Sequence, residues 1–213
     1  MQFRDHIHLW RTVVGSQMWN MHRPNSDIDY YVGYIADSKS FLLGNTHTGG
    51  HQTQTAEYDE TRFELGHIVH EVQKGNVNHL WGIISPVITL TSTTHDQLKT
   101  IVLANPVKSI YHSINGMAIH NIKHFLEEKK QGVADNQQLF LKKLRTIIRV
   151  LRFGIHALDT GQYEFAASDE TDPAISYYLL KELRIAYDNS SLPERADAEP
   201  YETFLLSQRM ENL

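Results

Sequence analysis

Residues 26–35 constrain the fold of this chain more than any other segment, because they combine two carboxylates with a strand pattern. Ile28, Tyr30 and Val32 alternate with their neighbours, and the run is rich in aromatic and β-branched residues, which predicts a half-buried strand. Alternate residues of a strand share a face, so Asp27 and Asp29 lie on one face, about 7 Å apart. Carboxylates this close repel unless a cation lies between them, and such oxygen ligands suit Mg²⁺ or Mn²⁺.

A short turn comes about ten residues before this strand. Gly15 and Ser16 follow an apolar stretch within residues 1–14, which is expected to form a helix or strand. Glycine lacks the Cβ that would block a phosphate from the backbone, and the next residues would present unpaired N–H groups at the start of a helix. Ser16 adds a hydroxyl. The pair therefore predicts a phosphate-binding turn.

The composition is that of an ordinary globular protein. The chain has 213 residues, enough for one large or two small domains, with 41% hydrophobic and 21% charged residues. It contains no cysteine, no apolar run of about 18 residues and no signal-peptide pattern at residues 1–6, so a cytoplasmic protein without a membrane span is expected. The formal net charge of -5 argues against broad clamping of duplex nucleic acid.

The remaining pattern changes from strands to helices along the chain. We expect a polar loop at residues 44–55, then a strand that leads into a helix at residues 63–74. The predicted fold class is α+β, with a mixed sheet and flanking helices in residues 1–90 and a mainly helical unit in residues 91–213. The helices predicted in this second unit cover residues 96–104, 107–129, 138–159, 177–184 and 199–210.

A glycine-serine turn followed by Asp-x-Asp resembles the nucleotidyltransferase superfamily that includes DNA polymerase beta and kanamycin nucleotidyltransferase. The RlaP-like predicted nucleotidyltransferases, which are linked to RNA repair, fit best because further matches reach the C-terminal part. Val77 stands where that family has proline, and Thr146 replaces a family histidine. The further matches are Lys74-Gly75-Asn76, Lys142-Lys143, Arg149, Leu158-Asp159-Thr160-Gly161 and Leu192-Pro193-Glu194.

The resemblance implies a third carboxylate and a metal site. In RlaP-like proteins this acid lies about five residues before an acid-leucine pair that opens a helix, and Asp59 has that position before Glu64-Leu65. Glu57 and Glu60 remain rivals. The resemblance thus implies that Asp27, Asp29 and Asp59 bind Mg²⁺ or Mn²⁺ and act on a nucleoside triphosphate. Gly15 and Ser16 would hold its phosphates.

A row of cations follows the helix predicted at residues 138–159. Lys142, Arg145, Arg149 and Arg152 are three or four residues apart, so they form one basic stripe opposite the apolar one. Periodicity alone favours a solvated helix face. The resemblance instead implies that Lys142, Lys143 and Arg149 contact phosphate or the acceptor.

The implied reaction moves a nucleotidyl group to a hydroxyl acceptor and releases pyrophosphate. The sequence leaves open whether the acceptor is an RNA end, a protein or a small molecule. An inactive nucleotide-binding or interaction module is one alternative, and an antitoxin-like protein adenylyltransferase is another. A zinc hydrolase is a third, because His112, His120 and His124 share one helical face, although the chain lacks a His-Glu-x-x-His pattern.

Overall fold

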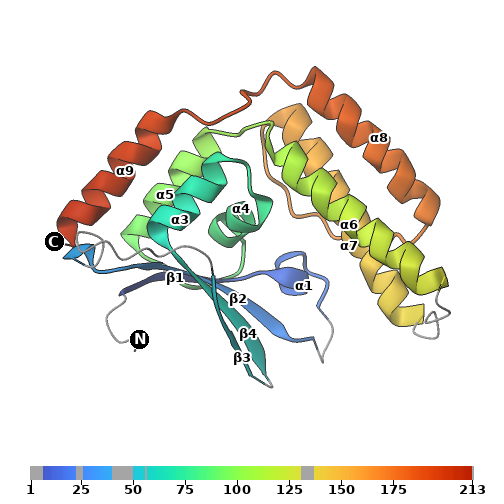
Figure 1. The fold of residues 1–213 in the computed structure, drawn as a ribbon, viewed down its shortest axis with the longest axis horizontal. Helices are drawn as coiled ribbons and strands as arrows, with labels where there is room; N and C mark the ends of the chain where they lie inside the picture. The colour runs from blue at the N-terminus through green and yellow to red at the C-terminus, as the bar shows by residue number, and fades with distance from the viewer. Residues whose placement is uncertain (1–6, 23–25, 40–49, 56, 131–136, 213) are drawn as a thin grey trace. The chain divides into compact units, whose positions relative to one another are not determined.

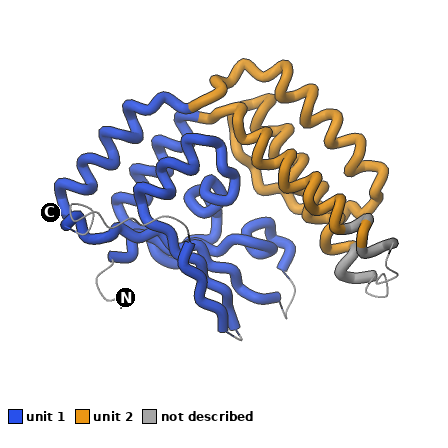
Figure 2. The backbone as a smooth tube through the Cα atoms, in the orientation of Figure 1, with its two compact units in different colours: residues 1–105, 196–213 blue, residues 106–195 orange. Residues whose placement is uncertain are grey.

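The computed structural model describes residues 7–22, 26–39, 50–55, 57–130 and 137–212. It contains two compact units (Figure 2), one formed by residues 1–105 with 196–213 and the other by residues 106–195. The sequence prediction placed the division after residue 90. It lies later because α5 (Thr93–Ala104) contacts the strand β1 (Ile7–Val13), and α9 (Ala198–Glu211) returns to pack on α5.

The first unit is built on a five-stranded sheet with the order β3-β4-β2-β1-β5. The pair β2 and β4 is parallel, whereas the pairs β1–β2, β1–β5 and β3–β4 are antiparallel. This mixed sheet confirms the predicted α+β class. The strands other than β1 are β2 (Ile28–Ile35), β3 (His51–Gln54), β4 (Tyr58–Glu64) and β5 (Ile88–Leu90).

Helices of the first unit lie on one face of this sheet (Figure 1). A carboxylate oxygen of Glu64 accepts a hydrogen bond from the Gly66 N–H at 2.6 Å and caps α3 (Leu65–Gln73). Asn76 caps α4 (Val77–Ile84) in the same way, with its side-chain oxygen accepting from the Asn78 N–H at 3.1 Å. The helices of this unit besides α5 and α9 are α1 (Gly15–Met18), α3 (Leu65–Gln73) and α4 (Val77–Ile84).

Helix α4 packs closely on the sheet because Gly82 has no side chain. The Trp10 indole N–H and the Thr12 hydroxyl both donate to the Gly82 carbonyl, at 3.2 and 2.7 Å. A Cβ at Gly82 would overlap the Tyr31 ring. The Tyr31 hydroxyl lies 2.7 Å from Nδ1 of the buried His79, so a polar contact also joins β2 to α4.

The buried His79 is expected to make stability depend on pH. Burial, assisted by the nearby His67, lowers the pKa of His79 from 6.5 to about 4. Between these values the unfolded chain binds the proton more readily, so its protonation stabilises the unfolded state as the pH falls. We expect the free energy of unfolding to decrease by about 2 kcal/mol from about pH 7 to about pH 5, measured by urea denaturation.

His79→Gln should flatten this pH dependence, although the free energy of unfolding at neutral pH will also change. His70→Gln is the matched control, because His70 is exposed on α3. Buried His95 also has a lowered pKa and adds a loss of the same sign, so some slope should persist in His79→Gln. An equal slope in wild type and His79→Gln would contradict the assignment to His79.

The second unit is helical. It contains α6 (Ile110–Lys130), α7 (Gln137–Thr160) and α8 (Pro173–Asn189), and α7 packs against both of the others. Buried Leu144, Ile148 and Leu151 lie on the apolar stripe predicted for α7. The helices predicted at residues 107–129 and 138–159 are therefore confirmed.

One local prediction was wrong. Residues 51–54 form the edge strand β3 and not a loop, because they pair with β4 in an antiparallel ladder. These four residues are polar and their side chains are all exposed, so the sequence has no alternation of apolar and polar residues that would predict a strand. Residues 44–49 of the predicted loop lie outside the described residues. Within the described part of the chain, no helix is both long and apolar enough to cross a membrane.

Candidate active site

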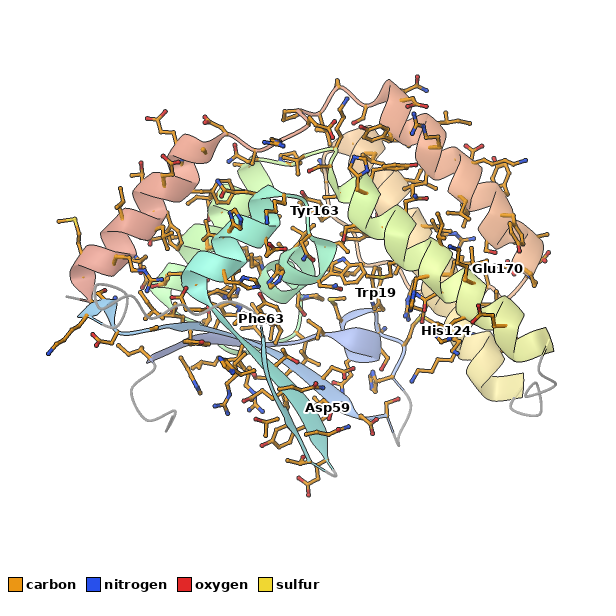
Figure 3. All side chains as sticks on the ribbon, viewed as in Figure 1. Trp19, Asp59, Phe63, His124, Tyr163 and Glu170 are labelled. Atoms are coloured by element: carbon orange, nitrogen blue, oxygen red, sulfur yellow. The ribbon has the colours of Figure 1, made fainter. Side chains whose placement is uncertain are left out.

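The strand register brings two of the predicted carboxylates together. Asp29 on β2 lies directly opposite Asp59 on β4 in the parallel ladder, and Figure 3 shows Asp59 on its strand. Neighbouring strands are about 4.8 Å apart, and paired residues project to the same face of a sheet. Asp27 immediately precedes β2 and is exposed. The predicted strand thus begins one residue after Asp27, and only Asp29 of the two lies within the ladder.

The two rival acids have different surroundings. Glu60 is next to Asp59 in sequence and therefore points to the opposite face. It is buried between two guanidinium groups, with carboxylate oxygens 3.1 Å from Arg11 Nε and 2.6 Å from Arg62 Nε. Glu57 is exposed and precedes the strand. Of the three acids, only Asp59 is in register with Asp29.

The glycine-serine turn lies against Asp29. The Val14 N–H donates to the Asp29 carbonyl at 2.8 Å, which fixes the turn beside β2. Gly15 has a φ of 65°, in the left-handed region that favours glycine. A Cβ at this position would overlap a carboxylate oxygen of Asp29. The predicted phosphate-binding residues Gly15 and Ser16 therefore adjoin a predicted metal ligand.

The donor set of this site consists of carboxylate oxygens. Among the described residues, no three His, Asp or Glu side chains form a ready-made metal cluster, so Asp27, Asp29 and Asp59 are not arranged as a closed cage. Mg²⁺ usually takes one or two carboxylates together with substrate phosphates. The facing pair Asp29 and Asp59, with the Asp29 carboxylate packed against the backbone of Gly15, fits that mode of binding.

The predicted cationic residues belong to α7 in the second unit. Lys142 is exposed and Lys143 is half-buried. Arg149 is only 7% exposed, and burial lowers its pKa to about 10. A solvated face, which periodicity alone favours, is therefore wrong at Arg149, because its side chain is buried.

Comparison with known proteins matches most of the chain to one family. Residues 3–186 match the family described as RlaP, RNA repair pathway DNA polymerase beta family. The chain belongs to the RlaP family. This membership confirms the resemblance and gives the chain a nucleotidyltransferase-like role.

The chain also resembles an archaeal protein. An uncharacterised protein of Methanocaldococcus jannaschii is 23% identical over 190 residues, which cover 85% of this chain and 74% of that protein.

The histidines considered for zinc are not gathered into one site in this RlaP chain. The rings of His120 and His124 lie 5.0 Å apart. His112 instead contacts the Tyr187 ring at 5.6 Å and lies 3.5 Å from a Glu194 carboxylate oxygen. The described residues contain no cluster of three metal-binding side chains, and the zinc alternative gains no support.

Sequence reasoning missed a network on the sheet face opposite Asp29. The Arg11 guanidinium lies 3.5 Å from the centre of the Tyr30 ring while also pairing with Glu60. Glu60 in turn pairs with Arg62. Such contacts leave no spacing signal in the sequence, because the partners come from three different strands.

Proposed function

We propose that this RlaP protein is a metal-dependent nucleotidyltransferase that moves a nucleotidyl group from a nucleoside triphosphate to a hydroxyl acceptor. The observation that supports it most is the register of Asp29 with Asp59, beside a glycine turn that fits closely against Asp29. The family description supports an RNA end as the acceptor. The products are the extended acceptor and pyrophosphate.

The carboxylates have distinct proposed roles. Asp27, Asp29 and Asp59 would hold Mg²⁺ or Mn²⁺, which when bound would stabilise charge on the attacking and leaving oxygens. Asp59 would help remove the proton of the acceptor hydroxyl. The hydroxyl oxygen then bonds to the α-phosphorus, and the bond from that phosphorus to the pyrophosphate oxygen breaks.

Hydrogen-bond donors would bind the triphosphate. Backbone N–H groups at Gly15 and Ser16, with the Ser16 hydroxyl, would donate to the β- and γ-phosphates. Lys142, Lys143 and Arg149 would contact phosphate or acceptor, since cations offset the charge that remains on a polyphosphate. Arg149 can do so only if the groups that bury it move.

The test is a transfer assay with each of the four labelled ribonucleoside triphosphates and Mg²⁺ or Mn²⁺. Short RNA and cell lysate serve as acceptors, and the Asp27→Asn, Asp29→Asn double variant is the control. Label moved to RNA by the wild type alone would support the proposal. Label on a protein would favour an adenylyltransferase, and binding without transfer would favour an inactive module.

A further inference from the structure

The segment between α7 and α8 is acidic and has no regular secondary structure. We call residues 162–172 the acidic strap. It contains four acids and neither lysine nor arginine: Glu164, Asp169, Glu170 and Asp172. Helix α7 has the opposite balance, since Asp159 is its one acid against Lys142, Lys143, Arg145, Arg149 and Arg152.

The acidic strap runs back along α7 within the second unit (Figure 1). A Glu164 carboxylate oxygen lies 3.7 Å from His156 Nε2. Further along, the Arg152 guanidinium donates to the Ser168 hydroxyl at 2.8 Å, and Arg145 Nε lies 3.8 Å from an Asp169 carboxylate oxygen. The strap therefore runs antiparallel to α7. Its partners on the helix, residues 156, 152 and 145, are four and seven residues apart and lie on one helical face.

The aromatic and the charged contacts between the acidic strap and α7 differ in strength. Phe153 on α7 packs against Tyr163 and Phe165, with ring centres 5.9 and 5.5 Å away, and anchors the start of the acidic strap. The carboxylates are weakly held, because the Glu164 side chain is 65% exposed and that of Asp169 is 94% exposed. Exposed pairs at these distances contribute little to stability. A competing anion could therefore displace them while the aromatic anchor stays.

We propose that the face of α7 formed by Arg145, Arg152 and His156 binds the phosphate backbone of an RNA strand, and that the acidic strap occupies this face when RNA is absent. Its exposed carboxylates stand where phosphates would bind. The choice of RNA rests on the proposed function, whereas the competition between strap and polyanion does not. A strap that merely connects α7 to α8 would leave RNA affinity independent of its charge.

The first test neutralises the acidic strap. Glu164→Gln with Asp169→Asn should tighten binding of a labelled single-stranded RNA by about threefold to tenfold, because weak competing pairs are lost. The assay omits triphosphate and divalent metal, so it can fail or succeed independently of nucleotidyl transfer. Circular dichroism verifies that the variant is folded.

A matched variant separates local competition from overall charge. Glu202→Gln with Glu211→Gln changes the net charge equally at exposed sites on α9. If it tightens RNA binding as much as the strap variant does, the proposal is wrong. Unchanged affinity of the strap variant would also overturn it.

The second test examines the cations. Arg152→Gln should weaken RNA binding and reduce the salt dependence of log K by about 0.7, the value for one phosphate contact on a single strand. Lys181→Gln, an exposed change on α8, should alter neither as much. Equal effects of the two variants would contradict a site on this face of α7.

A fluorescent probe can report movement of the acidic strap. The chain has no cysteine, so Ala167→Cys introduces one labelling position at an exposed residue of the strap. RNA should change the dye emission at the concentrations at which it binds, and excess salt should reverse the change. Binding of RNA with constant emission would overturn the displacement step.

Discussion

Asp29→Asn is expected to lower the rate of nucleotidyl transfer by about a thousandfold. The change removes a charge but little volume, so one proposed metal ligand is weakened while the backbone pairing with β4 persists. Charge stabilisation by a bound metal ion contributes several kcal/mol, and each 1.36 kcal/mol changes a rate tenfold. Initial rates of label transfer at saturating triphosphate would measure the loss.

Two companion variants make this result specific. Asp59→Asn should lose activity to a similar degree, because Asp59 faces Asp29 across the strands. Glu57→Gln, an exposed acid two residues earlier, should retain the wild-type rate. Full activity of Asp29→Asn, in a protein shown to be folded, would refute the metal assignment.

The strongest elements of the fold could be predicted from local pattern. Strand β2 shows alternation over residues 28–35, and α7 shows an apolar stripe over most of its length. Strand β3 could not be predicted, because its residues His51–Gln54 are polar. Their extended conformation depends on the backbone hydrogen bonds to β4. The boundary between the two units could not be predicted from local pattern either, because it depends on the contacts of α9 with α3 and α5.

The candidate site shows the same limit. The pairing of Asp27 with Asp29 was predicted from sequence, because alternate residues of a strand share a face; the structure places Asp29 on β2 and Asp27 just before it. The third acid depends on the register between β2 and β4, which local pattern does not specify. Similarly, helical spacing placed Arg149 on a basic stripe, but its burial is a property of the packed structure that this spacing does not predict.

Gly15→Ala is expected to damage both stability and activity. Its φ of 65° is unfavourable for alanine, which costs about 1–2 kcal/mol. The added Cβ would also overlap the Asp29 carboxylate, so either the turn or that side chain must move. Because misplacement by about 1 Å can cost a hundredfold in rate, we expect a loss of transfer of about that size.

Gly116→Ala separates this local effect from a general response to replacing glycine. Gly116 is exposed within α6, and a Cβ there would meet no atom within 4 Å. Alanine in a helix interior is favoured over glycine by about 1 kcal/mol, so this variant should be more stable and equally active. In urea denaturation the two variants should therefore shift in opposite senses, and in the transfer assay only Gly15→Ala should lose activity. An active and stable Gly15→Ala would mean that the turn does not set the position of Asp29.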